Sequence, residues 1–403
     1  MIRRRLTIVA ATAAPLLLLT ACSGGTPDKK PEPPPHPVFS KPLGAQPHAA
    51  LQQTQKAGSA SFTQKVTFTS KQGDAVLTIT GRLDFAGKRG EGSRTWLVPK
   101  AFPDKTKEVM LGAVGGQGFG DSSAKVAIDP QAVRYRSGSA TYWLRYPTVG
   151  SSAIGFDSIT SLRGSEAALG GTLLEVPILA RATAQQNTPG GGRSYRTEFG
   201  LDAAWGLLFP LDVRGELAHP RGADAAKAPV VMTLTVDSRG RITRAAADLS
   251  ALVNKDKERA LSTVTGIRSE LTLAAHGSAR PAMPAASDAV LDATKSVLDS
   301  TKTNPGDCID FNTGTHRIGL LVRVACTAPH DGRIFGQSRL ADGGFPGRAA
   351  AERRAEDGCR RAHDRAPSRW TDEAVVPGQY TWIWPVEASD EDPVATCYVV
   401  SRR

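Results

Sequence analysis

The sequence lacks the short motifs that most enzymes carry. It contains no Gly-x-Ser-x-Gly nucleophile elbow, no Walker A run and no His-Glu-x-x-His pair. The glycine-rich stretch 115–120 does not have the spacing of a dinucleotide-binding loop. Because catalysis usually leaves a cluster of reactive groups of this kind, these absences favour a binding protein over an enzyme, and no cofactor is expected.

A long hydrophobic run is also missing. The apolar stretch 6–21 is short for a membrane-spanning helix and contains Pro15. It follows three arginines and ends in small residues, which is the layout of a secretory signal. Residues 19–22 read Leu-Thr-Ala-Cys and resemble the lipobox of bacterial lipoproteins. The resemblance implies a signal peptide over 1–21, cleavage before Cys22 and a diacylglycerol on its thiol. An ordinary secretory signal or a membrane helix with an incidental cysteine is the alternative.

The segment 22–48 is rich in proline and has no apolar period. Such a segment forms an extended, partly polyproline-II tether that holds a domain away from the membrane, or it is simply disordered. The formal net charge of the chain is +11. A basic surface favours anionic lipid headgroups or an acidic wall polymer as partners, although a merely solvated surface is the plainer interpretation. The export signal argues against nucleic acid as a partner.

Closely spaced cysteine pairs are absent, which argues against a zinc site, and no metal ligand is expected. If the lipid takes Cys22, four of the five cysteines remain, and an even set in an exported chain is typical of disulfides. Cys308 and Cys326 flank two short expected strands and would meet in a hairpin. Cys359 lies on the apolar face of an expected helix and Cys397 lies in the last expected strand, so these two are expected to pair.

Residues 49–285 show mostly the pattern of strands. Segments 62–68 and 77–85 both alternate between apolar and polar residues, and the turn-like residues 71–74 between them predict a hairpin. Many amphipathic strands and few helices bury their apolar faces best as a curved antiparallel sheet, a half-barrel, wrapped over helices. Further strands are expected at 95–98, 108–111, 141–146, 195–199, 230–236, 241–245 and 268–274, and helices at 165–185 and 249–261.

The order of these features resembles the LolA/LppX-like lipoprotein carriers of the bacterial envelope. The lipobox and tether are followed by the strand 60–69, the segment 142–147, a long helix, the turn segment 236–242 and the closing strand 271–274. The resemblance implies an apolar cavity that holds acyl chains, in a non-enzymatic lipoprotein on the extracytoplasmic face of the cell membrane. The helix departs from the pattern, because Gly170, Gly171 and Pro177 would break or kink it.

The candidate ligand is therefore a lipid or glycolipid, and its candidate lining follows from the alternation. A cavity and a filled core give the same pattern, so a packed interior is the alternative interpretation. The candidate lipid-binding residues are Phe62, Val66, Leu77, Ile79, Leu83, Met232 and Leu234, with Trp143 near the mouth.

After an expected helix or spacer over 286–303, the segment 304–403 is expected to be a small disulfide-stabilised α+β module. Its Gly-Asp-Cys at 306–308, Val-Ala-Cys at 324–326 and Pro-His-Asp at 329–331, with two later cysteines, resemble the septum-formation domain. The resemblance implies an exported location and a binding role. The second functional hypothesis is accordingly a lipoprotein with a filled core that binds a cell-wall or division protein.

Two features of this module have both a functional and a structural interpretation. His330, between Pro329 and Asp331, is either a catalytic or metal-binding imidazole oriented by a carboxylate or a structural residue at a turn. The aromatic residues Tyr380, Trp382 and Trp384 share one face of an expected strand, where they form either a sugar platform or part of the core. The structural interpretation is preferred for both.

Overall fold

The computed structural model describes most of the chain from residue 36 onward. The predicted signal peptide, Cys22 and the first part of the tether lie outside the described residues, as do Gly170 and Gly171. Residues 35–403 belong to one compact unit. The described ranges are 36–111, 113–114, 118–119, 122–147, 173–174, 176–209, 211–218, 229–314, 319–341, 344–384 and 393–401.

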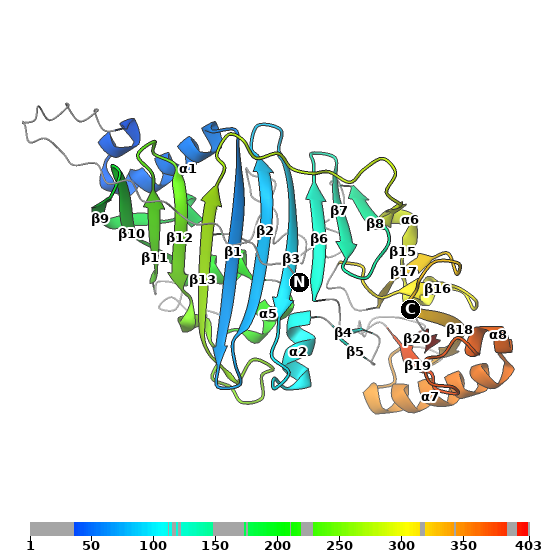
Figure 1. The fold of residues 1–403 in the computed structure, drawn as a ribbon. Coiled ribbons are helices and arrows are strands. Elements are labelled where there is room, and N and C mark those ends of the chain that lie inside the picture. The colour runs from blue at the N-terminus through cyan, green and yellow to red at the C-terminus, as the bar shows by residue number, and fades with distance from the viewer. Residues whose placement is uncertain are drawn as a thin grey trace, which may run out of the picture. The chain divides into compact units, whose positions relative to one another are not determined.

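A sheet of twelve strands dominates this unit (Figure 1). Its spatial order is β14-β8-β7-β6-β3-β2-β1-β13-β12-β11-β10-β9, and neighbours are antiparallel except β14 and β8, which run parallel. With the helices described below, this large mixed sheet makes the fold α+β. The strands are β1 Ser59–Ser70, β2 Ala75–Asp84, β3 Arg89–Leu97, β6 Ser123–Ile128, β7 Ala132–Ser137, β8 Trp143–Pro147, β9 Arg181–Thr188, β10 Gly192–Gly200, β11 Pro229–Val236, β12 Ile242–Asp248, β13 Val264–Ala274 and β14 Val290–Asp292.

The first hairpin shows how the sequence builds this sheet. β1 and β2 pair antiparallel, with Val66 opposite Leu77. Alternate residues of both strands are buried, because successive side chains of a strand point to opposite faces. The turn between them contains Gly73 at φ 105°, a backbone conformation that glycine adopts without steric cost. The hairpin predicted from the alternation is confirmed.

One expected strand, 108–111, is wrong. These residues are the last part of helix α2 (Asp104–Leu111), which buries Thr106 and Met110 on one face. Thr106 Oγ1 donates a hydrogen bond to the carbonyl of Ala260 at 2.6 Å. A short apolar run such as Val-Met-Leu does not by itself distinguish a strand from a helix, and here the contact with a distant loop decides the outcome.

The two expected helices also differ from the structure. Over 249–261 the chain forms only the 3₁₀ helix η5 (Ser250–Leu252) and turns. The side chains of Asp248, Asn254 and Asp256 each accept a hydrogen bond from the N–H two residues ahead, at 2.9–3.0 Å. Such local bonds compete with helix formation.

The expected helix 165–185 falls partly outside the described residues. Its last five residues belong to β9, an edge strand whose side chains are mostly exposed. Pro177 lies in the 3₁₀ helix η4 (Val176–Ile178), where its fixed φ angle fits a tight turn. For the described residues of 165–185, the predicted helix is therefore wrong.

The end of the expected tether is folded. Residues 36–48 form the 3₁₀ helices η1 (Pro37–Ser40) and η2 (Leu43–Ala45) and the start of α1 (Gln46–Lys56). Val38 and Phe39 are buried in the main apolar cluster, and the Arg193 guanidinium lies 4.6 Å from the centre of the Phe39 ring. These two buried apolar residues hold the segment against the domain, which its high proline content did not predict.

A second, smaller sheet contains six strands in the order β15-β17-β16-β18-β20-β19. Helix α7 contacts β18 and β20. The disulfides Cys308–Cys326 and Cys359–Cys397 are formed, which confirms the predicted pairing. The elements are β15 Val297–Asp299, β16 Cys308–Asp310, β17 Leu320–Val324, β18 Gly332–Arg339, β19 Thr381–Ile383, β20 Val394–Val400, α7 Arg348–Arg365 and α8 Ser368–Thr371.

The expected spacer 286–303 connects the two sheets through regular structure. β14 pairs with β8 of the large sheet, and β15 pairs with β17 of the small one. Between them lies the single helical turn α6 (Ala293–Ser296), which Asp292 caps by accepting the Thr294 N–H at 3.0 Å. The 3₁₀ helix η6 (Ser300–Lys302) follows β15. A further pair of two-residue strands, β4 (Ala113–Val114) and β5 (Gly118–Phe119), forms a separate ribbon.

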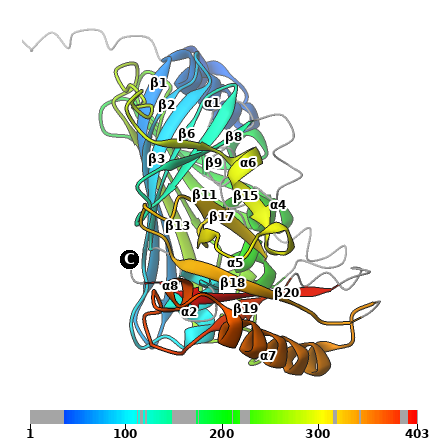
Figure 2. The same ribbon diagram turned by 90° about the vertical axis from the view of Figure 1, so that its right-hand side faces the viewer.

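Two more helices cover one face of the large sheet. α4 (Leu201–Leu208) and α5 (Leu211–Glu216) lie on the same side of it (Figure 2), and α4 contacts β10 and β11. In the part of the chain that the structure describes, no helix combines the length and the apolar character that crossing a bilayer requires.

Candidate functional site

The helix-covered face of the large sheet is apolar and carries most of the candidate lipid-binding residues. The side chains from β1, β2 and β11 are between 0 and 4 % exposed and belong to one continuous cluster. They meet there because each strand contributes every second residue to the same face. This set is Phe62, Val66, Leu77, Ile79, Leu83, Met232 and Leu234.

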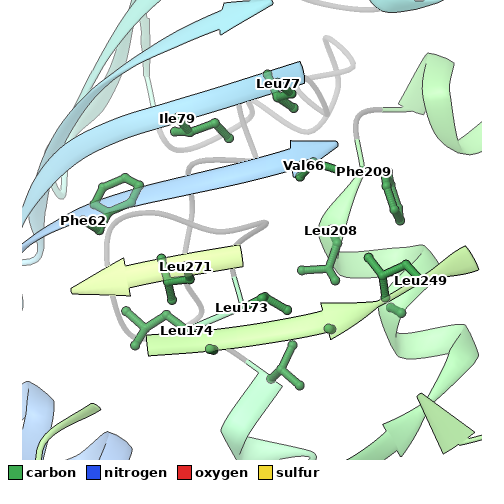
Figure 3. Packing of buried hydrophobic residues seen from close by; sticks show 14 of the residues in the cluster. Phe62, Val66, Leu77, Ile79, Leu173, Leu174, Leu208, Phe209, Leu249 and Leu271 are labelled. Atoms are coloured by element: carbon green, nitrogen blue, oxygen red, sulfur yellow. The ribbon is translucent and has the colours of Figure 1, made fainter. Parts of the chain in front are cut away.

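Apolar side chains approach this face from the other side. Leu208 and Phe209, at the end of α4, and Leu249 point toward the strand residues (Figure 3). Leu173 and Leu174 do the same, and the backbone N–H of Leu173 donates to Oε1 of the buried Gln64 at 2.9 Å. The candidate site is thus a buried apolar cluster, with strand residues on one side and mainly leucines on the other.

The two ends of this face are packed differently. At one end, the Phe68 ring lies 5.7 Å from that of Trp96 and 6.2 Å from that of Phe209, so aromatic contacts fill the interior. At the other end, Phe62 lies opposite Gly81, and a Cβ there would stand 2.7 Å from the Phe62 ring. The same Cβ would clash with the backbone oxygen of Glu91, so only glycine fits at position 81.

Trp143 does not join the other seven candidates. Its neighbour Leu144 belongs to the apolar cluster, so alternation places Trp143 on the opposite face of β8. The Arg136 guanidinium covers it there, 4.9 Å from the ring centre. Trp143 was expected beside the other candidates, near the mouth of a cavity, but it lies on the opposite face of the sheet.

His330 is held by two acceptors in the small module. Its Nδ1 lies 2.8 Å from the carbonyl of Ala328 and its Nε2 lies 3.2 Å from Oε2 of Glu373, which also pairs with Arg333. A ligand atom of His330, one of Glu373 and Sγ of Cys308 lie within 4.8 Å of one another. Because that sulfur is bonded to Cys326, it is not a thiolate and does not ligate a metal. These contacts favour the structural interpretation of His330.

The carboxylate next to His330 in sequence has another partner. Asp331 accepts the Phe311 N–H at 3.0 Å and lies against Asp310, and both carboxyl groups are buried. Burial, and then the neighbouring Asp331, raise the pKa of Asp310 to about 7. One proton shared by the pair removes a like-charge repulsion that a buried site tolerates poorly.

This acid pair belongs to a contact between the two sheets, which we call the inter-sheet junction. The hydroxyl of Tyr142 donates to Oδ2 of Asp310 at 3.0 Å, and that of Tyr146 donates to the carbonyl of Thr313. A Cβ on Gly314 would stand 2.7 Å from the Tyr135 ring, and its φ of 72° also favours glycine. Burial and the Asp310 carboxyl raise the pKa of Tyr142, which stays a neutral donor.

The aromatic row of the small module is half-buried. Tyr380 packs against Phe335 at 5.9 Å between ring centres, and Trp382 contacts two apolar clusters. Trp384 packs against one of these clusters. This arrangement favours the core interpretation over a sugar platform.

Sequence reasoning missed two groups that the fold assembles. One is the inter-sheet junction, whose partners lie 167–168 residues apart in the chain. The other is a cavity of about 450 Å³ that contains Trp205, Arg214 and Arg259. No local spacing signals either group, because each depends on elements that meet only in the folded chain.

No protein-family model matches the chain, and no curated protein sequence matches it. Among solved structures, the lipoprotein LppX of Mycobacterium tuberculosis is similar, with 12% identity over 57% of this chain and 93% of that one and a TM-score of 0.26. A putative outer membrane lipoprotein-sorting protein domain from Vibrio parahaemolyticus has 10% identity, 60% and 95% coverage and a TM-score of 0.21. The Pseudomonas aeruginosa MucA/MucB complex has 8% identity, 88% and 93% coverage and a TM-score of 0.23. At these TM-scores the likenesses carry no argument about this chain.

Proposed function

We propose that the protein is a membrane-anchored, extracytoplasmic lipoprotein that binds or carries a lipid or glycolipid and is not an enzyme. The ligand's acyl chains would lie between the large sheet, acting as a half-barrel, and the leucines that face it. The observation that supports the proposal is that seven predicted lining residues from three strands belong to one buried apolar cluster.

The energetics of such a site are favourable. Each methylene group removed from water contributes about 0.8 kcal/mol, so a long acyl chain gains enough to offset the cost of ordering it. The anchor would be the diacylglycerol on Cys22, since two acyl chains hold a protein at a membrane more stably than one. The full chain has a net charge of +11, of which the three arginines of the signal peptide supply +3, and the mature chain at +8 is suited to a surface of anionic headgroups.

A small-to-large substitution tests whether the interior accepts a ligand. Ala245 is buried on β12 between Leu234 and Leu271, whereas its neighbour Ala246 faces the other side of the sheet. In an open site, Ala245→Leu should lower the affinity for a fluorescent C16 fatty acid about tenfold and change stability little, since the added methyl groups occupy ligand space. Ala246→Leu is the matched control and should change neither quantity.

The second candidate function is an interaction lipoprotein with a filled core, which binds a cell-wall or division protein through its septum-formation-type module. The aromatic contacts of Phe68 with Trp96 and Phe209 favour it, because they occupy one end of the interior. In that case Ala245→Leu should cost about 1–3 kcal/mol of stability by overpacking, and the wild type should not bind the fatty acid. The same titration and unfolding curves therefore separate the two functions.

A further inference from the structure

A cavity of about 450 Å³ lies where α4, α5 and the loop after η5 meet. Trp205 of α4 and Arg214 of α5 line it, together with Leu217 and Arg259. Leu217 is buried in the main apolar cluster and Trp205 packs against the same cluster. The cavity therefore borders the main apolar cluster, and two positively charged side chains line it.

Aromatic and backbone contacts hold Arg214 in position. Its guanidinium lies 5.3 Å from the centre of the Trp205 ring, and its Nη2 donates to the carbonyl of Phe209 at 3.2 Å. The Trp205 Nε1 in turn donates to the carbonyl of Arg214 at 3.2 Å. Among the described residues, no carboxylate lies within ion-pair distance of Arg214, and its buried Nε has no hydrogen-bond partner.

Two acidic side chains close to the cavity already have partners. The Glu216 carboxylate accepts the Ala260 N–H at 2.6 Å. Asp256 lies 4.0 Å from Nε of Arg259, at the limit of an ion pair between two exposed side chains. Such a pair is weak, so the Arg259 charge at the rim is only partly compensated.

A half-buried guanidinium that lines a cavity and has no carboxylate partner among the described residues favours an anion beside it. Phosphate oxygens suit this geometry, because the planar guanidinium donates two parallel hydrogen bonds. We propose that the cavity binds the phosphate group of a phosphate ester, with Arg214 as the inner contact and Arg259 as the outer one. Where the phosphate belongs to a lipid headgroup, the proposal rests on the proposed function, since the acyl chains would then enter the adjoining apolar space.

A competition experiment on the full mature chain tests this. The protein is offered equal amounts of dioleoyl phosphatidylglycerol and dioleoylglycerol, which have the same acyl chains with and without a phosphate, and bound lipid is counted by native mass spectrometry. The wild type should carry the phosphate-bearing lipid in about tenfold excess, because one charged contact discriminates by roughly that factor. Arg214→Gln should bring the ratio close to one.

Two further variants keep the test decisive. Arg89→Gln, at the exposed start of β3, removes the same charge far along the chain from the cavity and should leave the ratio unchanged. Arg259→Gln alters only the rim and should lower the excess by a smaller factor than Arg214→Gln. This second variant answers the question even if loss of the Arg214 contacts impairs folding.

A parallel calorimetric titration with glycerol 3-phosphate distinguishes a lipid headgroup from a soluble ester. If the wild type loads neither lipid but binds glycerol 3-phosphate in an Arg214-dependent way, the phosphate site stands and the carrier function fails. If both lipids load equally and glycerol 3-phosphate does not bind, the phosphate site is wrong and the carrier function stands. A phosphate preference that persists in Arg214→Gln and Arg259→Gln would also overturn the site.

Discussion

The two sheets of this molecule hold their interiors together in different ways. The large sheet has one continuous apolar cluster, to which most of its strands and its covering helices contribute. Among its described residues, the small sheet has three separate clusters of five, four and four buried residues. Small cores bury too little apolar surface to offset chain entropy, and both disulfides lie in this part of the chain.

The two disulfides differ in burial and in the length of chain that they close. Cys359 and Cys397 are buried inside one of the small clusters and close a separation of 38 residues. Cys308 is buried but its partner Cys326 is exposed, and they close a separation of 18 residues. The comparison teaches that the large region is stabilised by one continuous apolar interior, whereas the small one depends more on covalent links.

The largest expected effect comes from removing the buried disulfide. The double variant Cys359→Ala and Cys397→Ala should lose about 3–4 kcal/mol of stability in the small region, because the unfolded chain regains the freedom of a long loop. Hydrogen exchange measured by peptide should show faster exchange in α7 and β18 and unchanged exchange in β1 and β2. Equal loss of protection in both regions would show that they are not stabilised separately.

A smaller effect is expected from pH at the inter-sheet junction. The pKa of Asp310 is raised to about 7 in the folded chain, against about 3.9 in an unfolded one. The folded chain therefore holds this proton more tightly, so the stabilisation is fully present below about pH 4 and is lost as pH rises through about 7. Between pH 5 and 7 the free energy of unfolding should fall by at most about 1.4 kcal/mol per unit.

Asp310→Asn provides the check, since a neutral amide can still accept the Tyr142 hydroxyl. Its unfolding free energy should depend less on pH over this range than that of the wild type, as measured by urea denaturation. Asp74→Asn, an exposed site in the first hairpin turn, is the control and should retain the wild-type dependence. A wild-type slope in Asp310→Asn would contradict the shared-proton account.

The smallest effect should follow from Tyr142→Phe, which removes the hydroxyl that donates to Asp310. The loss should be about 1 kcal/mol, and calorimetry should show the two regions unfolding less cooperatively. Tyr195→Phe removes a hydrogen bond to Gln46 within the large region and is the matched control. It should cost a similar amount without separating the transitions; a separation there as well would remove the special role of the junction.

Local pattern predicted the parts of this fold that depend on neighbours in sequence. Alternation gave the β1–β2 hairpin, and cysteine placement gave both disulfides. Strands β6 and β7 were missed, although Val126 and Ile128 alternate visibly. The segment 108–111 was misread because a short run of three apolar residues fits a helix and a strand equally well, and the contact of Thr106 with a distant carbonyl is not visible in the sequence.

From the sequence, only the buried face of the strands that form the candidate site was predictable. Strand period identified seven residues that are buried together, but it placed Trp143 with them, although Trp143 lies on the opposite face. The Arg214 cavity and the inter-sheet junction depend on side chains from distant segments, such as Tyr142 and Asp310. The period of apolar residues carries no information about such long-range contacts, because it indicates only which side of a helix or strand faces inward.

The most direct test of the central claim is native mass spectrometry of the mature chain, extracted gently from its own membrane, before and after lipid extraction. We predict a bound species with the mass of one acyl lipid, beyond the covalent anchor on Cys22, that organic solvent removes and that Ala245→Leu reduces relative to Ala246→Leu. A protein that carries no lipid, takes up none when offered, and loses stability in Ala245→Leu would contradict the claim and favour a filled core.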